Sequence, residues 1–154
     1  MSKLCSITWG GHFFMHARKL SQYLFLWTLG GSIYYTLEMI FRGFSHWSMF
    51  GLGGICFLFM YLQGKVTEWK DSIGIQVLRS TIFVICGEFI TGIIVNKWLH
   101  WEVWDYSDQP LQLFGQICFP FAMLFSILCA LGIVFSGNIM HWTYGEKKPR
   151  FHLI

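Results

Sequence analysis

The sequence has few charged residues for its length. Only 12% of its 154 residues are Asp, Glu, Lys or Arg, whereas 55% are hydrophobic and 19% are aromatic. The mean hydropathy is +0.50. A soluble domain of this size has no core large enough for so much apolar surface. The composition therefore excludes an ordinary soluble protein and indicates an integral membrane protein.

Motifs for metal binding and catalysis are also missing. The five cysteines form no CxxC pair, and the six histidines show no ligand spacing, so neither a zinc site nor a disulfide framework is indicated. The sequence contains no GxxxxGK[ST], no HExxH and no nucleophile elbow. We therefore expect no metal, no cofactor and no catalytic residues. An ATPase, if one is needed, must be a separate chain.

Four apolar runs predict an all-α fold, a polytopic integral membrane protein with a four-helix transmembrane bundle. About 20 residues of helix cross a hydrocarbon core. The expected spans are residues 21–41, 49–62, 74–96 and 117–135. The remaining segments are an aromatic and basic N-terminal interfacial segment at 1–20, an outer loop at 97–116 and a cytoplasmic tail at 136–154. The chain, 1–154, then forms a single membrane domain.

Basic residues are distributed unevenly between the two sides of such a chain. One side holds both termini and the connection after the second span, and it carries eight: Lys3, Arg18, Lys19, Lys65, Lys70, Lys147, Lys148 and Arg150. The other side carries Arg42 and Lys97. Because cytoplasmic loops are enriched in Lys and Arg, both termini should be cytoplasmic in a cell (plasma) membrane. The basic charge is thus a topology signal and does not indicate nucleic-acid binding.

A carboxylate, Glu88, lies inside the third apolar run. An ionisable group at that depth is costly in hydrocarbon, so it should face protein, water or a counter-charge. Glu38 lies near the outer end of the first span. Arg42 follows it by four residues on the same helical face, where the two can pair. Two interpretations of Glu88 stay open: a proton- or cation-binding group, or a carboxylate permanently hydrogen-bonded or paired with Arg42.

The segment WDYSDQP, residues 104–110, combines acidic and aromatic side chains after the third span. It is either an ordered loop anchored at the headgroups, in which Asp105 accepts backbone N–H bonds, or a cap that folds back over the bundle. In the second interpretation Trp104 and Tyr106 bind a cation or an organic ring by stacking. Acidic residues make poor lipid neighbours, so we favour the cap.

Topology and charge together predict one polar site in the outer half of the bundle. Carboxylates of the first and third spans, with Asp105 as a further member, would gather around the guanidinium of Arg42. The expected substrate-binding residues are Glu38, Arg42, Glu88, Trp104, Asp105, Tyr106 and Ser107.

Several uncommon strings occur in order along nearly the whole chain: FRGFSHWSMFGLGGI, GEFITGIIVNKWLHWEVWDYS, PLQLFGQIC and HWTYGEKKP. On these strings the sequence resembles the bacterial ABC-transporter type IV (CmpB-type) family, which has small animal transmembrane relatives sharing the WDYS motif. The resemblance implies a small polytopic membrane protein. The positions that match the family's pattern are Glu38, Arg42, Gly43, Glu88, Gly92, Trp104, Asp105, Tyr106, Ser107 and Gly115.

Residues and resemblance together indicate a transporter component or small channel-like permease of the inner membrane. Its expected partners are the lipid bilayer, further copies of itself, and a separate ATPase or larger membrane complex. One alternative is an assembly or regulatory partner of a larger complex, docked through residues 64–71 and 144–151. Another is a lipid-active membrane enzyme with Glu88 or Asp105 as general base.

Overall fold

A computed structural model describes the backbone of residues 3–152 and the side chains of residues 15–152. The described part of the chain is helical apart from its connections. Its elements are α1 (Lys3–Arg42), α2 (Trp47–Val66), α3 (Ile73–Gly92), the π-helix η1 (Ile93–Trp98) and α4 (Phe119–Tyr144). Four helical segments within it are long and apolar enough to cross a membrane. The predicted fold class is thereby confirmed: the chain is a multi-pass, all-α membrane protein.

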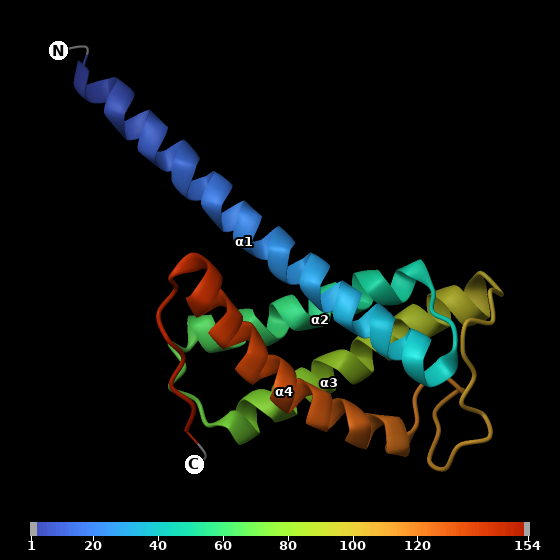
Figure 1. The fold of residues 1–154 in the computed structure, drawn as a ribbon. Helices are drawn as coiled ribbons and strands as arrows, with labels where there is room; N and C mark the ends of the chain where they lie inside the picture. Colours follow the sequence, from blue (N-terminus) through green and yellow to red (C-terminus); the bar gives the residue numbers. More distant parts are fainter. Residues whose placement is uncertain (1–2, 153–154) are drawn as a thin grey trace.

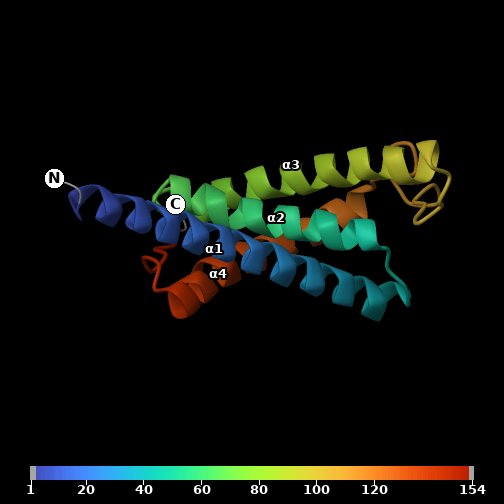
Figure 2. The same cartoon turned by 90° about the horizontal axis from the view of Figure 1, so that it is seen from above.

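Successive helices run in opposite directions, so the bundle has two distinct ends (Figure 1). We call the end that carries residues 43–46 and 99–118 the loop end, and the end that carries residues 67–72 and the C-terminal segment the terminal end. Figure 2 shows α1 lying along α2, with the beginning of α1 projecting beyond the other helices. Residues 3–20, which the sequence assigns to the membrane interface, continue directly into the first span as one helix. Their interfacial location stays a prediction.

The bundle has an apolar core that also contains several polar residues, and its outer surface is apolar as well. Large apolar side chains such as Ile82, Ile90 and Leu131 are more than half exposed on its surface. The buried polar or charged residues are Gln22, Glu38, Gln76, Ser80, Glu88, Asn96, Gln116 and Ser136. In a bilayer the exposed face contacts hydrocarbon, whereas polar groups need partners inside the protein. The distribution is therefore that of a membrane bundle rather than of a soluble one.

Glycines bring α1 and α2 into close contact. A Cβ atom added at Gly53 would collide with the side chain of Tyr34, and one added at Gly54 would collide with the backbone of Trp27. Small residues at such positions allow two membrane helices to approach closely. The approach holds Tyr34 in the middle of the bundle, and this position matters for the site described below.

The last helix is longer than the fourth predicted span. It continues past Phe135 to Tyr144 and ends at Gly145, whose φ of 66° is readily adopted by glycine. Ser136, Gly137 and Met140 are buried in this extension. The additional turns therefore pack in the core, and only the residues after Tyr144 leave the helix.

The terminal end is closed by contacts between the C-terminal segment and the other helices. Glu146 accepts a hydrogen bond from Gln22 (2.7 Å) and forms an ion pair with Lys65 (3.2 Å). Partial burial raises the pKa of Glu146, but the bonds from Gln22 and Lys65 outweigh it and leave the pKa below its usual value. Further along, the backbone N–H of Ile73 donates to the carbonyl of His152 at 2.8 Å. Residues 64–71 and 144–151 therefore share one face.

Candidate functional site

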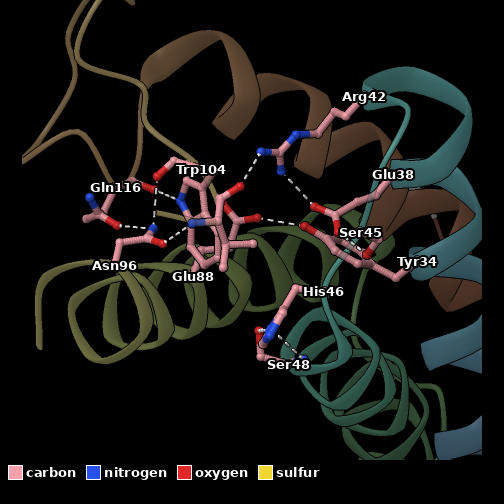
Figure 3. Close-up of polar contacts among 11 residues, drawn as sticks. Tyr34, Glu38, Arg42, Ser45, His46, Ser48, Glu88, Asn96, Trp104 and Gln116 are labelled. Atoms are coloured by element: carbon pink, nitrogen blue, oxygen red, sulfur yellow. Dashed lines mark hydrogen bonds and ion pairs between the residues drawn. The ribbon is translucent and has the colours of Figure 1, made fainter. Parts of the chain in front are cut away.

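Glu88 is buried in the centre of the bundle, with only 1% of its surface exposed. Its Oε1 atom accepts a hydrogen bond of 2.7 Å from the hydroxyl of Tyr34 on α1 (Figure 3). Its Oε2 atom is also buried, and no described residue donates a hydrogen bond to it. Glu88 takes part in none of the ion pairs that the described residues form. A buried carboxylate is therefore left with one oxygen without a partner, a costly arrangement in an apolar core.

Glu38 and Arg42 form the ion pair predicted from their spacing. The Nη1 atom of Arg42 lies 2.9 Å from Oε1 of Glu38, and the hydroxyl of Ser45 donates to Oε2 at 2.5 Å. The second guanidinium nitrogen of Arg42 donates to the carbonyl of Val103 at 3.2 Å (Figure 3). The pair thus joins the end of α1 to the long loop. The charge of Arg42 is directed to Glu38, and the arginine donates no hydrogen bond to Glu88.

The long loop, residues 99–118, folds back onto the bundle. Trp104 and Tyr106 are 4% and 7% exposed, and the ring of Tyr106 stacks on Phe121 of α4 with centroids 4.6 Å apart. The indole N–H of Trp104 donates to the backbone carbonyl of Gln116 at 3.1 Å. The loop is therefore an ordered cap and not only a headgroup anchor. Burial raises the pKa of the Tyr106 hydroxyl, so it stays neutral at physiological pH.

Asn96 holds the two halves of this cap together. Its amide nitrogen donates to the carbonyl of Trp104 (2.9 Å) and to the side-chain oxygen of Gln116 (2.7 Å). Its amide oxygen accepts from the backbone N–H of Val103 at 2.7 Å (Figure 3). Asn96 belongs to η1, where the N–H of Leu99 reaches back five residues to a carbonyl. Single π-turns of this kind are frequent at functional positions.

Asp105 and Ser107 lie on the exposed side of the same loop. The carboxylate of Asp105 accepts from the hydroxyl (2.6 Å) and the backbone N–H (2.9 Å) of Ser107. These two bonds lower the pKa of Asp105. Gly115, with φ of 69°, lies directly against the side chains of Asp105 and Ser107. A Cβ atom at this position would collide with Asp105. Asp105 therefore stabilises its own turn, and the predicted grouping of Asp105 with Glu38 around Arg42 does not form.

The cap has a strained backbone. Non-glycine residues with positive φ occur at several of its positions: His100, Glu102, Leu111 and Phe114. Such conformations each cost on the order of 1 kcal/mol and persist where surrounding contacts fix them. Hydrogen bonds that Asn96, Arg42 and Gly115 form with the backbone of residues 103–106 fix these conformations. The loop therefore has a defined shape over the bundle.

Two cavities have Glu88 in their linings. The first, of about 320 Å³, lies between all four helices, and we call it the bundle cavity; its lining includes Gly30, Tyr34, Cys56, Glu88 and Leu131. The second, of about 200 Å³, lies under the long loop, and we call it the loop cavity; its lining includes Glu88, Leu113, Ile117, Phe119 and Phe125. Glu88 and Phe125 line both cavities. Glu88 is therefore the ionisable residue that the two linings have in common.

The predicted site residues separate into three groups in the structure. Glu88 lines the cavities; Glu38, Arg42, Trp104 and Tyr106 build the closure above it; Asp105 and Ser107 face away. The polar residues that the sequence analysis missed are Tyr34, Ser45, Asn96 and Gln116. A signal existed for Tyr34, because it precedes Glu38 by four residues on the same helical face. Among the described residues no group of three or more His, Cys, Asp or Glu side chains could hold a metal ion.

Replacing Asn96 by leucine should destabilise the cap by about 2 kcal/mol. The variant leaves the buried N–H of Val103 and the carbonyl of Trp104 without partners, and an unsatisfied buried group costs about 1–3 kcal/mol. The expected result is a lower free energy of unfolding in mixed micelles and faster hydrogen exchange in residues 99–118. Asn138→Leu is the matched control, since Asn138 bonds only within its own helix. Equal losses in the two variants would contradict the assigned role of Asn96.

The comparisons with known proteins give one match. The family model described as "Putative ABC-transporter type IV" matches residues 22–153, which include α2, α3, η1, α4 and the second half of α1. Neither the curated proteins nor the solved structures give a match. All the residues of the site described above lie inside the matched range.

Proposed function

We propose that this chain, which belongs to the ABC-transporter type IV family, is a small transporter component or channel-like permease in which Glu88 contacts the solute. One observation carries the proposal: a buried carboxylate oxygen without a partner belongs to a residue that lines two cavities. Ionisable groups inside a membrane domain are rare and typically mark pathways for ions or substrates. The bundle cavity and the loop cavity are then successive parts of one path.

The charge balance around Glu88 favours a cation. Arg42 is paired with Glu38, and none of the described residues that line either cavity is basic. The acidic side chain of Glu88 therefore has no ion-pair partner among the described residues. A proton or a positively charged solute supplies one, whereas an anion would meet repulsion.

The other residues of the predicted binding set act on the shape of the path. Glu38 and Arg42 fix the end of α1 to the long loop, and Trp104 and Tyr106 form the buried face of the cap. Asp105 and Ser107 set the turn that lets the cap close. In this proposal Glu88 binds the solute, and these six residues hold the closure that controls access to it.

The proposed orientation places the loop end outside and the terminal end in the cytoplasm of a cell with the protein in its plasma membrane. Four spans are few for a complete transport path, which supports a homo-oligomer. The family name suggests a larger transporter complex with a separate ATPase. The surface that binds this ATPase would be the terminal end. Its exposed charged residues are Glu68, Lys70, Lys147, Lys148 and Arg150.

The test is cation flux into proteoliposomes. Liposomes with the wild-type protein should take up radiolabelled methylammonium, or protons reported by a pH-sensitive dye, faster than empty liposomes under an inside-negative potential. Glu88→Gln keeps the shape of the side chain and its acceptor for Tyr34 but removes the charge. Its flux should fall to the level of empty liposomes while its helical content and melting temperature stay near those of the wild type.

Glu102→Gln is the matched control for this experiment. Glu102 is an exposed carboxylate of the long loop and lines neither cavity, so its variant should transport like the wild type. Wild-type flux through Glu88→Gln would overturn the proposal. A Glu88→Gln protein that unfolds in detergent would show that the carboxylate is a structural group.

A second candidate, an assembly or regulatory partner, is favoured by the contact between residues 64–71 and 144–151. The two segments are joined by the ion pair of Lys65 with Glu146 and by the packing of Trp69 on Phe151. The exposed basic residues of these two segments are Lys70, Lys147, Lys148 and Arg150. Copurification of a stoichiometric larger protein, lost on changing Lys70 and Lys147 to glutamate, would support this role.

A further inference from the structure

The bundle cavity opens sideways, between α1 and α4. Ile33 on α1 and Leu131 on α4 line it, and they are 36% and 62% exposed. The two helices touch at the terminal end, where Arg18 and Ser21 bond to Tyr144. Nearer the middle of the bundle they separate (Figure 1). In a membrane this opening faces lipid chains, so molecules dissolved in the bilayer reach the cavity without passing through water.

The lining of the cavity is apolar except at one place. Its walls are Gly, Ile, Leu, Val, Phe, Met and Cys side chains, and its polar groups are Tyr34 and Glu88. The hydroxyl of Tyr34 donates a hydrogen bond to Oε1 of Glu88. The remaining polar atom is Oε2 of Glu88, which is buried and receives no donor from the described residues. The lining is thus apolar around one acidic side chain, and the buried Oε2 of that side chain is the acceptor that still lacks a donor.

These features define the chemistry of an occupant. It needs one hydrogen-bond donor, positively charged to balance the carboxylate, and a hydrocarbon body without further polar groups. A phospholipid headgroup does not meet this requirement, because no described lining residue is basic and its phosphate would stay unpaired. A volume of about 320 Å³ is near the lower end of the range for small-molecule sites.

We propose that the bundle cavity binds amphiphilic amines, with the ammonium group on Oε2 of Glu88 and the hydrocarbon chain toward the opening between α1 and α4. This assignment rests on the proposed function and gives its solute class: single-chain organic cations that enter from the bilayer. Glu88 also lines the loop cavity, so in this proposal a bound ammonium group lies at the start of the path toward the loop end.

Binding is tested with a decylamine analogue that carries a photoreactive diazirine on its chain. The protein in phosphatidylcholine nanodiscs is irradiated, and labelled peptides are identified by mass spectrometry. Labels should fall on residues lining the cavity, such as Cys56 and Leu131, and unlabelled decylamine should compete. Glu88→Gln should reduce this labelling about tenfold or more, since a hydrogen bond to a charged group is lost.

Three controls define the result. Leu131→Trp fills the opening and should reduce labelling of Cys56, whereas Ile127→Trp, one turn away on the same exposed face of α4, should not. The corresponding decanol analogue, which is neutral, should label the cavity at least about tenfold less. Equal labelling by the alcohol, or labels spread over all lipid-facing helices, would overturn the assignment.

The experiments can reject the transport function and the amphiphilic amine site independently of each other. Methylammonium flux that depends on Glu88, without labelling of the cavity by the amine probe, would leave the transport function and reject the amphiphilic solute. Cavity labelling that depends on Glu88, without flux, would keep the binding site and reject transport.

Discussion

Replacing Arg42 by alanine should lower the free energy of unfolding by about 3 kcal/mol. Removing one partner of a largely buried ion pair leaves the other charge uncompensated, at a cost of about 3–5 kcal/mol. The Glu38 side chain is 9% exposed and would retain only Ser45, while the carbonyl of Val103 would lose its donor. We take the lower end of the range because the Arg42 side chain is 22% exposed. Unfolding by SDS in mixed micelles measures the loss.

Arg79→Ala is the matched control for this variant. Arg79 also pairs with a carboxylate, Asp71, but its side chain is 49% exposed, and such pairs contribute about 0–1 kcal/mol. The double variant Glu38→Gln with Arg42→Leu should lose less than Arg42→Ala, because no charge stays unpaired. Similar losses for the two arginine variants would show that Glu38 is not stabilised by Arg42.

Trp69→Ala should destabilise the terminal end by about 4 kcal/mol. Trp69 is 5% exposed although it lies in a connection between helices. Its ring packs against Gly64 and Gly137 and meets Phe151 edge-on at 5.5 Å. Truncation of a buried tryptophan leaves a large cavity and costs about 3–5 kcal/mol. The expected result is a lower unfolding free energy, with faster hydrogen exchange in residues 145–152.

The control for Trp69 is Trp142→Ala, because Trp142 is 70% exposed on α4. That variant should stay within about 0.5 kcal/mol of the wild type, as surface substitutions usually do. If Trp69→Ala were as stable as Trp142→Ala, the C-terminal segment would not depend on the packing of Trp69. The surface proposed for a partner would then lack its support.

Features set by local spacing could be predicted from the sequence. The four spans follow from the length of the apolar runs, and the pair of Glu38 with Arg42 follows from four residues of separation on one helical face. The cap was favoured because acidic residues are poor lipid neighbours, and the burial of Trp104 and Tyr106 agrees with that interpretation. In each case the prediction depends only on residues that are close together in the sequence.

Features set by contacts between distant segments could not be predicted. Tyr34 and Glu88 lie 54 residues apart, and they meet because glycines let α1 approach α2 closely. Asn96 bonds to Gln116 across 20 residues, which the apolar pattern of the third span does not show. Asp105 looked like a member of the buried site, but the side toward which it faces depends on the turn that Ser107 and Gly115 make.

The most direct test of the central claim, that the solute contacts Glu88, is an infrared difference spectrum of the reconstituted protein on addition of methylammonium. If the claim holds, the wild-type protein gives a change in the carboxyl bands that is missing from Glu88→Gln and retained in Glu102→Gln. Identical difference spectra for the wild type and Glu88→Gln would contradict the account, because the solute would then bind without contact to the buried carboxylate.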